Sequence, residues 1–441
     1  VGVAFTTLTD SDLKFKPAKD SKNKEHEIKT ASDASLLLKN SDRTLRKNTW
    51  INFHSAYDQY ENTLSQTLYY TYLDFNATAK VYNFKDYVDS TTFADEIDES
   101  FILNLYKNVE SFKDVYRKYK EKVALLLKKQ LKLKELEPWD MSMDLSKTQI
   151  KVNIETAKKM VLEGLKPLGK DYCSHIKEAF NNNWISWLPK ENKLTGAYSI
   201  GGVKGLDKYY ILTNFNNTID AVMTIAHELG HSMNSYYSVK NQKVYTETSI
   251  FYAEIASICV ETLMILYFLK KYSSKKDFVN LYLKHLFDNF FGSTTRQIVF
   301  SNFEYEANKL VNKGHPFVPK ALKELYLNLL VKYEGWDHKK VAKYRKHPYS
   351  YMLSTILRIP HFYAGNFYVY KYAIGQICGL IMANKIYKGD KKAVNNFIKF
   401  LSSGSSLPPL DTVKLLGIDL TREEPYKEAK EILLSLIKKF S

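Results

Sequence analysis

The stretch TIAHELGHSMNSYYS, Thr224 to Ser238, decides how the sequence is interpreted, because it contains the pattern His-Glu-Leu-Gly-His. Apolar residues recur at three- and four-residue spacings from Ile219 to Ser235, which predicts a buried helix with Asp220 as a candidate cap. On that helix His227 and His231 are one turn apart on the same face, so both imidazoles can bind one ion. The stretch therefore predicts two ligands of a zinc site.

Glu228, between the two histidines, has a different expected role. It is rotated by about 100° from His227 around the helix, so it faces away from the shared ligand position but reaches a water molecule held there. This arrangement is typical of a general base in a hydrolytic zinc site. Gly230 leaves room for a neighbouring backbone to approach the helix. The five-residue pattern alone occurs by accident in about one sequence in a hundred of this composition, so the site needs further ligands to be credible.

A third ligand of the zinc site must come from a segment further along the sequence. A metzincin pattern would place glycine and histidine where this sequence has Asn234 and Tyr237, which excludes that class. The segment Thr248 to Leu269 is a very apolar predicted helix whose only acids within its apolar body are Glu254 and Glu261, seven residues apart on one face. A buried carboxylate is costly unless it is paired or binds a metal. We expect Glu254 to be the third ligand and Glu261 to accept a hydrogen bond from a ligand imidazole; the alternative is two surface acids on a less buried helix.

A strand-like segment precedes the histidine helix. GAYSIGGVKGLDKYYILTNF, Gly196 to Phe215, is rich in glycine, tyrosine and β-branched residues and predicts two short strands around a glycine-rich turn. An edge strand beside a metal site can hold an extended peptide, so Gly196, Ala197 and Tyr198 are candidate substrate-binding residues. A hairpin that only packs on helices is the alternative.

The rest of the chain is predicted to be mostly helical, with apolar periodicity over Leu45–Thr71, Glu99–Leu133 and Ile154–Asn181. A chain of 441 residues is long enough for two lobes. The longest apolar run, Ile377 to Ala383, falls short of the roughly 18 residues of a membrane span, so no membrane association is expected.

Charge and cysteine content restrict the partners and the compartment. The net charge is +16, but the lysines are dispersed, so no nucleic-acid partner is expected; a basic, nucleic-acid-associated helical protein is kept as an alternative. The 3 cysteines show no paired spacing, which argues against a disulfide framework and favours a reducing, cytoplasmic location.

Several further segments resemble one family. They are TGAYSIGG (Thr195 to Gly202), FYAEIAS (Phe251 to Ser257), RQIVFSNFE (Arg296 to Glu304), RIPHFYAGNFYVYKYAIG (Arg358 to Gly375), and FLSSGSS followed by LLGIDL (Phe400 to Ser406 and Leu415 to Leu420). With the histidine motif, they are similar in content and order to oligoendopeptidase F and the wider thimet-oligopeptidase-like zinc metallopeptidases, the gluzincins. Asn234 departs from the histidine that family members often have there, and the stretch between His361 and Phe367 is one residue longer than the usual form.

The resemblance implies a mainly α, two-lobed helical zincin-type peptidase with a deep substrate channel and a small β-sheet next to the active-site helix. It implies one Zn²⁺ ion, oligopeptide substrates and a role in peptide catabolism. It also assigns the third ligand to Glu254, and it makes His361, Tyr363 and Tyr370 candidate donors to the scissile carbonyl and the transition state.

The family has roughly 150 further residues at its N-terminus by this resemblance. Residues 1–40 are therefore expected to be a remnant of that region, and residues 41–441 the helical catalytic zinc peptidase region. A zinc endopeptidase is the favoured function. A truncated, catalytically inactive homologue that binds zinc or peptide is the alternative, and the sequence gives no oligomeric state.

Overall fold

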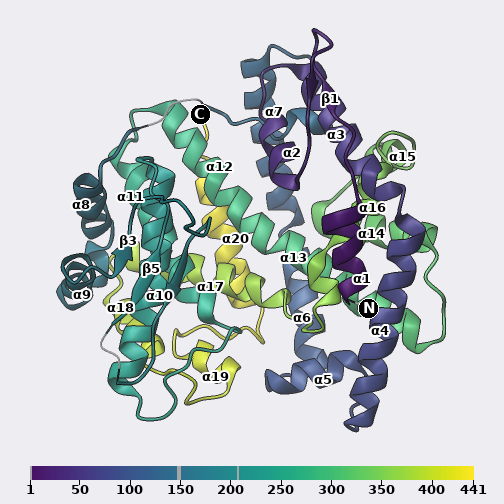
Figure 1. The fold of residues 1–441 in the computed structure, drawn as a ribbon. Coiled ribbons are helices and arrows are strands. Elements are labelled where there is room, and N and C mark those ends of the chain that lie inside the picture. The colour runs from purple at the N-terminus through teal and green to yellow at the C-terminus, as the bar shows by residue number, and fades with distance from the viewer. Residues whose placement is uncertain (1, 147–149, 206–207) are drawn as a thin grey trace. The chain divides into compact units, whose positions relative to one another are not determined.

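The computed structural model describes residues 2–146, 150–205 and 208–441, and the chain forms two compact units (Figure 1). Unit 1 comprises the residues up to Ala94, then Asp98–Leu145 and Thr295–Val369. Unit 2 comprises Asp95–Ile97, Ser146–Thr294 and Tyr370–Ser441. The predicted mainly α class is confirmed. None of the helices in the described ranges has the length and apolar character needed to span a bilayer.

Unit 1 is built almost entirely from helices. Its α-helices are α1 Gly2–Thr6, α2 Ala31–Leu37, α3 Arg43–Asp58, α4 Glu61–Val81, α5 Tyr87–Ala94, α6 Glu99–Glu110, α7 Lys113–Leu131, α13 Thr295–Asn312, α14 Pro319–Glu334, α15 His338–Tyr344 and α16 Tyr351–Ser354. A π-helical turn spans Thr7–Asp12, and 3-10 turns span Pro138–Asp140, Thr355–Arg358 and Pro360–Tyr363. Strands β1 (Ala18–Lys19) and β2 (Glu25–His26) form a two-stranded antiparallel pair.

Unit 2 contains the predicted metal-binding helices and a small sheet. Its α-helices are α8 Ile154–Gly164, α9 Lys170–Asn181, α10 Ile219–Asn241, α11 Ala253–Lys271, α12 Lys276–Ser293, α17 Tyr370–Tyr387, α18 Lys391–Leu401, α19 Pro409–Lys414 and α20 Glu424–Ile437, with a 3-10 turn at Lys166–Leu168. Strands β3 (Ile185–Ser186), β5 (Tyr210–Leu212) and β4 (Tyr198–Ile200) lie in that order, parallel between β3 and β5 and antiparallel between β5 and β4. The two strands predicted from Gly196 to Phe215 are confirmed, whereas residues 206 and 207 of their turn lie outside the described ranges.

Each of the three segments with helical periodicity is helical, as predicted, and contains two helices. The stretch Ile154–Asn181 shows the cause most clearly, because Pro167 lies in the 3-10 turn between α8 and α9 and Gly169 follows with φ +96°. Proline removes a backbone donor, and a positive φ ends the helical path. Such breaks are short, so the apolar spacing continues across them and periodicity alone does not detect them.

Close packing of three helices forms the centre of unit 2, where α11 lies between α10 and α17 (Figure 1). Glycines make the approach possible at both interfaces. A Cβ placed on Gly230 of α10 would lie 2.7 Å from the Cα of Ser257 on α11, and one on Gly375 of α17 would lie 2.8 Å from the Cβ of Glu254. Both distances are shorter than side-chain contacts permit, so any larger residue would push the helices apart. The predicted role of Gly230 in close backbone packing is confirmed.

A buried carboxyl group lies in the core of unit 1. Glu304 of α13 is 0% exposed, and its Oε1 accepts a hydrogen bond of 3.1 Å from the hydroxyl of Tyr87. Its Oε2 has no hydrogen-bond partner among the described residues. Burial raises the pKa of Glu304 to about 8, so this side chain is a neutral carboxylic acid at pH 7.

Glu304→Gln should remove a pH dependence of stability. Below its unfolded pKa of about 4.3 the carboxyl is protonated in both states. As pH rises from there to about 8, the unfolded chain releases the proton while the folded chain keeps it, so the free energy of unfolding decreases. We expect the variant to be more stable than the parent at pH 8 by on the order of a few kcal/mol. Urea denaturation at pH 5 and pH 8 measures this, and an equal pH dependence in both proteins would contradict it.

Candidate active site

The N-terminus of α10 orients the histidine helix, and its cap differs from the predicted one. Thr218 has an extended backbone, and its hydroxyl accepts a hydrogen bond of 3.2 Å from the amide of Ala221, so Thr218 is the N-cap. The prediction of Asp220 as the cap is therefore wrong. Asp220 lies inside the first turn of the helix and accepts a hydrogen bond of 3.2 Å from the hydroxyl of Tyr282. The helix also extends beyond the predicted end, to Asn241.

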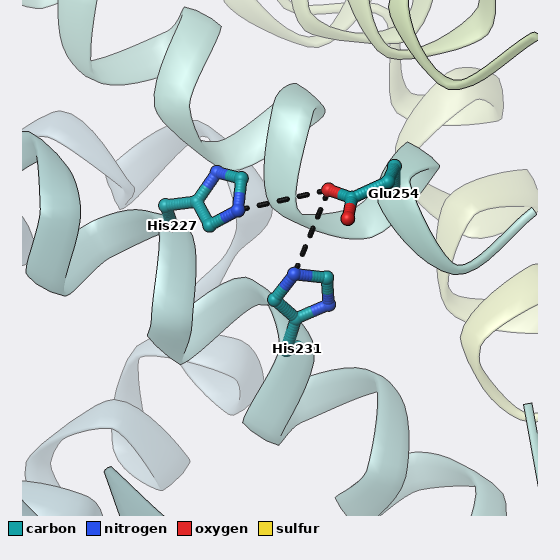
Figure 2. A group of neighbouring side chains, drawn as sticks. All are labelled: His227, His231 and Glu254. Atoms are coloured by element: carbon teal, nitrogen blue, oxygen red, sulfur yellow. Dashed lines mark ion pairs between the residues drawn. The ribbon is translucent and has the colours of Figure 1, made fainter. Parts of the chain in front are cut away.

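The three predicted ligand residues converge in unit 2 (Figure 2). The helix that carries Glu254 begins at Ala253 rather than at Thr248, so Glu254 lies in the first turn of α11. Its Oε2 is 3.6 Å from Nε2 of His227 and 3.6 Å from Nε2 of His231. The three donor atoms lie within 4.8 Å of one another. The close approach of α10 to α11 at Gly230 explains how the two histidines come so near Glu254. Gly375 lets α17 pack directly against Glu254.

The spacing of these atoms fits a metal ion better than a direct ion pair. An imidazole and a carboxylate in contact would form a hydrogen bond of roughly 2.7–3.0 Å, which is shorter than both distances found here. Two ligands at about 2.1 Å from a tetrahedral ion lie about 3.4 Å apart, close to the 3.6 Å that separates each imidazole from the carboxylate. Two imidazole nitrogens and one carboxylate oxygen are also a donor set of a catalytic zinc site.

Glu261 makes the contact that was predicted for it. Its Oε2 is 3.1 Å from Nδ1 of His227. Burial opposes ionisation of Glu261, but hydrogen bonds with His227 and His285 lower its pKa to about 2. Burial likewise opposes protonation of His227, and the hydrogen bond with Glu261 raises the pKa of His227 overall. Because an ionised carboxylate only accepts hydrogen bonds, Nδ1 of His227 carries the proton and Nε2 keeps its lone pair for a metal.

Two residues of α12 that the sequence analysis did not identify complete the surroundings of Glu261. Oε1 of Glu261 accepts a hydrogen bond of 2.9 Å from Nδ2 of Asn289 and lies 3.4 Å from Nε2 of His285. His285 and Asn289 are four residues apart, so they project from the same face of α12. That polar pair was the available signal, but a sequence alone does not reveal which helix it faces.

Glu261→Ala should weaken metal binding without unfolding the protein. The variant removes the acceptor that fixes the orientation and protonation of His227, and losses of this kind typically cost 10- to 100-fold in metal affinity, so we expect about that reduction. Competition with a chromophoric zinc chelator measures the affinity directly. Glu163→Ala is the matched control, because Glu163 is a half-exposed acid of the same unit that pairs with Lys271 away from the ligand residues. Equal affinities in the two variants would exclude the role of Glu261.

Glu228 lies in the same pocket as the three ligand residues. It is 7% exposed, and no hydrogen bond or ion pair holds its carboxylate in the described parts of the chain. Burial raises its pKa. A carboxylate with a raised pKa and no protein partner, beside a set of metal ligands, is suited to accept a proton from water.

The pocket also includes strand β4. It has a volume of 570 Å³ and is lined by Ala197, Tyr198, Ser199, Ile200, Gly201, His227, Glu228, His231, Asn234, Ser235, Thr248, Ala253 and Glu254. β4 is an edge strand of its sheet, and the hydroxyls of Ser199 and Ser232 lie 2.7 Å apart and join it to α10. Of the three predicted substrate residues, Ala197 and Tyr198 line the pocket, whereas Gly196 does not and accepts a hydrogen bond from Asn214.

The candidate donors of the RIPHFY segment have different surroundings. His361 is partly exposed, and its Nδ1 lies 2.6 Å from the hydroxyl of Tyr368, a residue that the sequence analysis did not single out. Burial lowers the pKa of His361, assisted by the charge of Arg296, so the imidazole is neutral at pH 7.

Tyr363 and Tyr370 are both buried. The hydroxyl of Tyr363 donates to the carbonyl of Leu357 at 2.8 Å, within unit 1. The hydroxyl of Tyr370 donates to Asp95, which also pairs with Lys371 at 2.6 Å within unit 2. Both hydroxyls therefore have protein acceptors, and the hydroxyl of this segment that lies beside His361 is that of the half-buried Tyr368.

Comparison with known proteins shows which family the chain resembles. Residues 36–432 match the model of peptidase family M3. The chain is 43% identical over 426 residues to the oligoendopeptidase F homologue of Mycoplasma genitalium, covering 96% of this chain and 70% of that protein. It is 35% identical over 427 residues to oligopeptidase PepF of Bacillus subtilis, covering 96% of this chain and 61% of that protein.

A solved structure supports the fold. The crystal structure of oligoendopeptidase-F from Enterococcus faecium matches with a TM-score of 0.76 at 24% identity, covering 100% of this chain and 70% of that one. The family match covers most of the chain, including the histidine helix, the strand segment and the RIPHFY segment. The chain therefore belongs to peptidase family M3 and is a metalloendopeptidase related to oligoendopeptidase F.

Proposed function

We propose that the protein hydrolyses peptide bonds in short oligopeptides and depends on one zinc ion held by His227, His231 and Glu254. The observation that carries the proposal is the convergence of these three donor groups beside Glu228 in one pocket. The names of the relatives from Mycoplasma genitalium and Bacillus subtilis support oligopeptides as the substrate class.

The chemistry follows from the donor set and from Glu228. When bound, zinc would supply Lewis-acid polarisation of the scissile carbonyl and lower the pKa of a water in its open coordination position. Glu228 accepts a proton from the attacking water as the carbon–oxygen bond forms. The same carboxyl then delivers that proton to the nitrogen of the leaving amine as the carbon–nitrogen bond breaks. Glu261 holds His227 in the tautomer that a metal requires.

Strand β4 supplies a surface for an extended peptide. The backbone groups on its free edge are suited to pair with a substrate strand, and Ala197 and Tyr198 line the pocket beside Glu228. The tie between Ser199 and Ser232 fixes that strand against the helix that carries the base. A peptide bound along β4 would be held by main-chain hydrogen bonds, which suits a peptidase that accepts varied sequences.

The role of His361 as a donor to the scissile carbonyl rests on the resemblance of its segment to the family motif. A neutral imidazole with Nδ1 beside Tyr368 supports this role, because Nε2–H is then the nitrogen that donates to a substrate oxygen. Catalytic roles for Tyr363 and Tyr370 receive no support from their contacts. The three cysteines are all unpaired, which supports the predicted reducing, cytoplasmic location. The location and the boundary at residue 40 stay predictions from the sequence.

A chelator-controlled cleavage assay tests the proposal. The purified chain, stripped of metal and reloaded with one equivalent of zinc, should cleave an internally quenched oligopeptide, and the product masses should show cleavage at an internal bond. The stripped protein should be inactive and should regain activity with zinc. Stoichiometric zinc binding without cleavage would instead indicate the inactive, peptide-binding homologue.

A further inference from the structure

The loop Ala364–Val369, between the 3-10 turn that holds His361 and the start of α17, has an unusual backbone. Gly365 has φ +77° and Phe367 has φ +39°. Glycine adopts a positive φ freely, but the same conformation is strained for a bulky side chain. Phe367 is only 1% exposed. A buried aromatic residue with a left-handed backbone conformation makes this loop a strained segment.

One hydroxyl holds the strained residue in place. The amide N–H of Phe367 donates to the hydroxyl oxygen of Tyr87 at 2.9 Å, and that hydroxyl donates in turn to Oε1 of Glu304 at 3.1 Å. Tyr87 is 2% exposed, and its ring and the Phe367 ring pack in a T-shaped arrangement with centroids 6.3 Å apart. A strained conformation persists only where its surroundings fix it, and these buried contacts do so.

The next residue along the chain is Tyr368, whose hydroxyl lies 2.6 Å from Nδ1 of His361. Because the peptide plane between Phe367 and Tyr368 is set by the φ and ψ of Phe367, the position of Tyr368 depends on the anchored amide. All five residues, Glu304, Tyr87, Phe367, Tyr368 and His361, belong to unit 1.

We propose that Tyr87 and Glu304 are positioning residues, which hold the amide of Phe367 so that the hydroxyl of Tyr368 engages and orients the imidazole of His361. The effect on catalysis rests on the proposed function of His361, whereas the effect on the pair of Tyr368 and His361 does not. The buried Glu304 acts as a neutral hydrogen-bond acceptor, so an amide at this position should replace it.

The test compares Tyr87→Phe, Glu304→Leu and Glu304→Gln. Tyr333→Phe is the matched control, because Tyr333 is a buried tyrosine of unit 1 whose hydroxyl donates to Asn302 at 3.0 Å. Tyr87→Phe and Glu304→Leu should lower kcat roughly 10- to 100-fold with KM within about twofold, because the imidazole is misplaced rather than removed. Glu304→Gln and Tyr333→Phe should keep the parental kcat, and melting temperatures show that all four variants fold.

A second readout does not depend on activity. The ring-nitrogen chemical shifts of His361, assigned by comparison with His361→Gln, report the hydrogen bond at Nδ1 in ¹⁵N-histidine-labelled protein. The bond should be lost in Tyr87→Phe and kept in Tyr333→Phe. An unchanged Nδ1 signal in Tyr87→Phe would overturn the positioning role. If the signal changes as expected but His361→Gln itself retains full activity, the positioning stands and the proposed role of His361 fails.

Discussion

Glu228→Gln should nearly abolish peptide cleavage and leave metal binding intact. Glutamine has the same shape but cannot accept the proton of the attacking water, so we expect kcat/KM to fall by roughly 10²- to 10⁴-fold. Because Glu228 lies beside the ligands without contributing a donor atom to them, metal content should stay at about one ion per chain.

The measurement pairs cleavage of a quenched peptide with elemental analysis of the same sample. Glu247→Gln is the control, since it makes the same change of charge at an exposed acid next to Thr248, a residue of the pocket lining. The control should keep parental activity. If Glu228→Gln retains parental turnover, Glu228 is not the base and the mechanism is wrong.

Gly230→Ala should lower both stability and metal affinity. The new Cβ would lie 2.7 Å from the Cα of Ser257, which is backbone and cannot rotate away, so α10 and α11 must separate. Overpacking of this kind typically costs about 1–3 kcal/mol. The same displacement moves His227 and His231 away from Glu254, so we expect metal affinity to fall as well.

Gly292→Ala is the matched control for this variant. Gly292 also lies within a helix, α12, but among the described residues outside its own helical turn no atom lies within 4 Å of a Cβ built there. Alanine should therefore be neutral or stabilise the fold by up to about 1 kcal/mol through helix propensity. Urea denaturation and zinc titration of both variants give the comparison. Equal behaviour of the two would show that the approach of α10 and α11 does not position the ligands.

The residues of the candidate metal site could be predicted because each left a local signal in the sequence. His227 and His231 have a helical spacing, and Glu254 and Glu261 are isolated acids in an apolar helix. The 3.1 Å contact between Glu261 and His227 follows from the cost of burying an unpaired carboxylate. Each of these signals lies within a single helix.

What could not be predicted depends on contacts between segments distant in sequence. The pairing of Glu261 with His285 and Asn289 requires α12 to lie beside α11, and the partner of His361 depends on the strained φ of Phe367. Resemblance to the family motif predicted Tyr363 and Tyr370 as catalytic donors, but the hydroxyls of both have buried acceptors. It did not identify Tyr368, whose hydroxyl lies beside His361. The cap of α10 was misplaced by two residues because threonine and aspartate are both good caps.

The most direct test of the proposed metal site is a crystal structure of the zinc-loaded protein with anomalous scattering recorded on both sides of the zinc absorption edge. We expect one anomalous peak per chain at about 2.0–2.2 Å from Nε2 of His227, Nε2 of His231 and a carboxylate oxygen of Glu254, with Glu228 outside the ligand set. A peak bound elsewhere, or Glu228 among the ligands in place of Glu254, would contradict it.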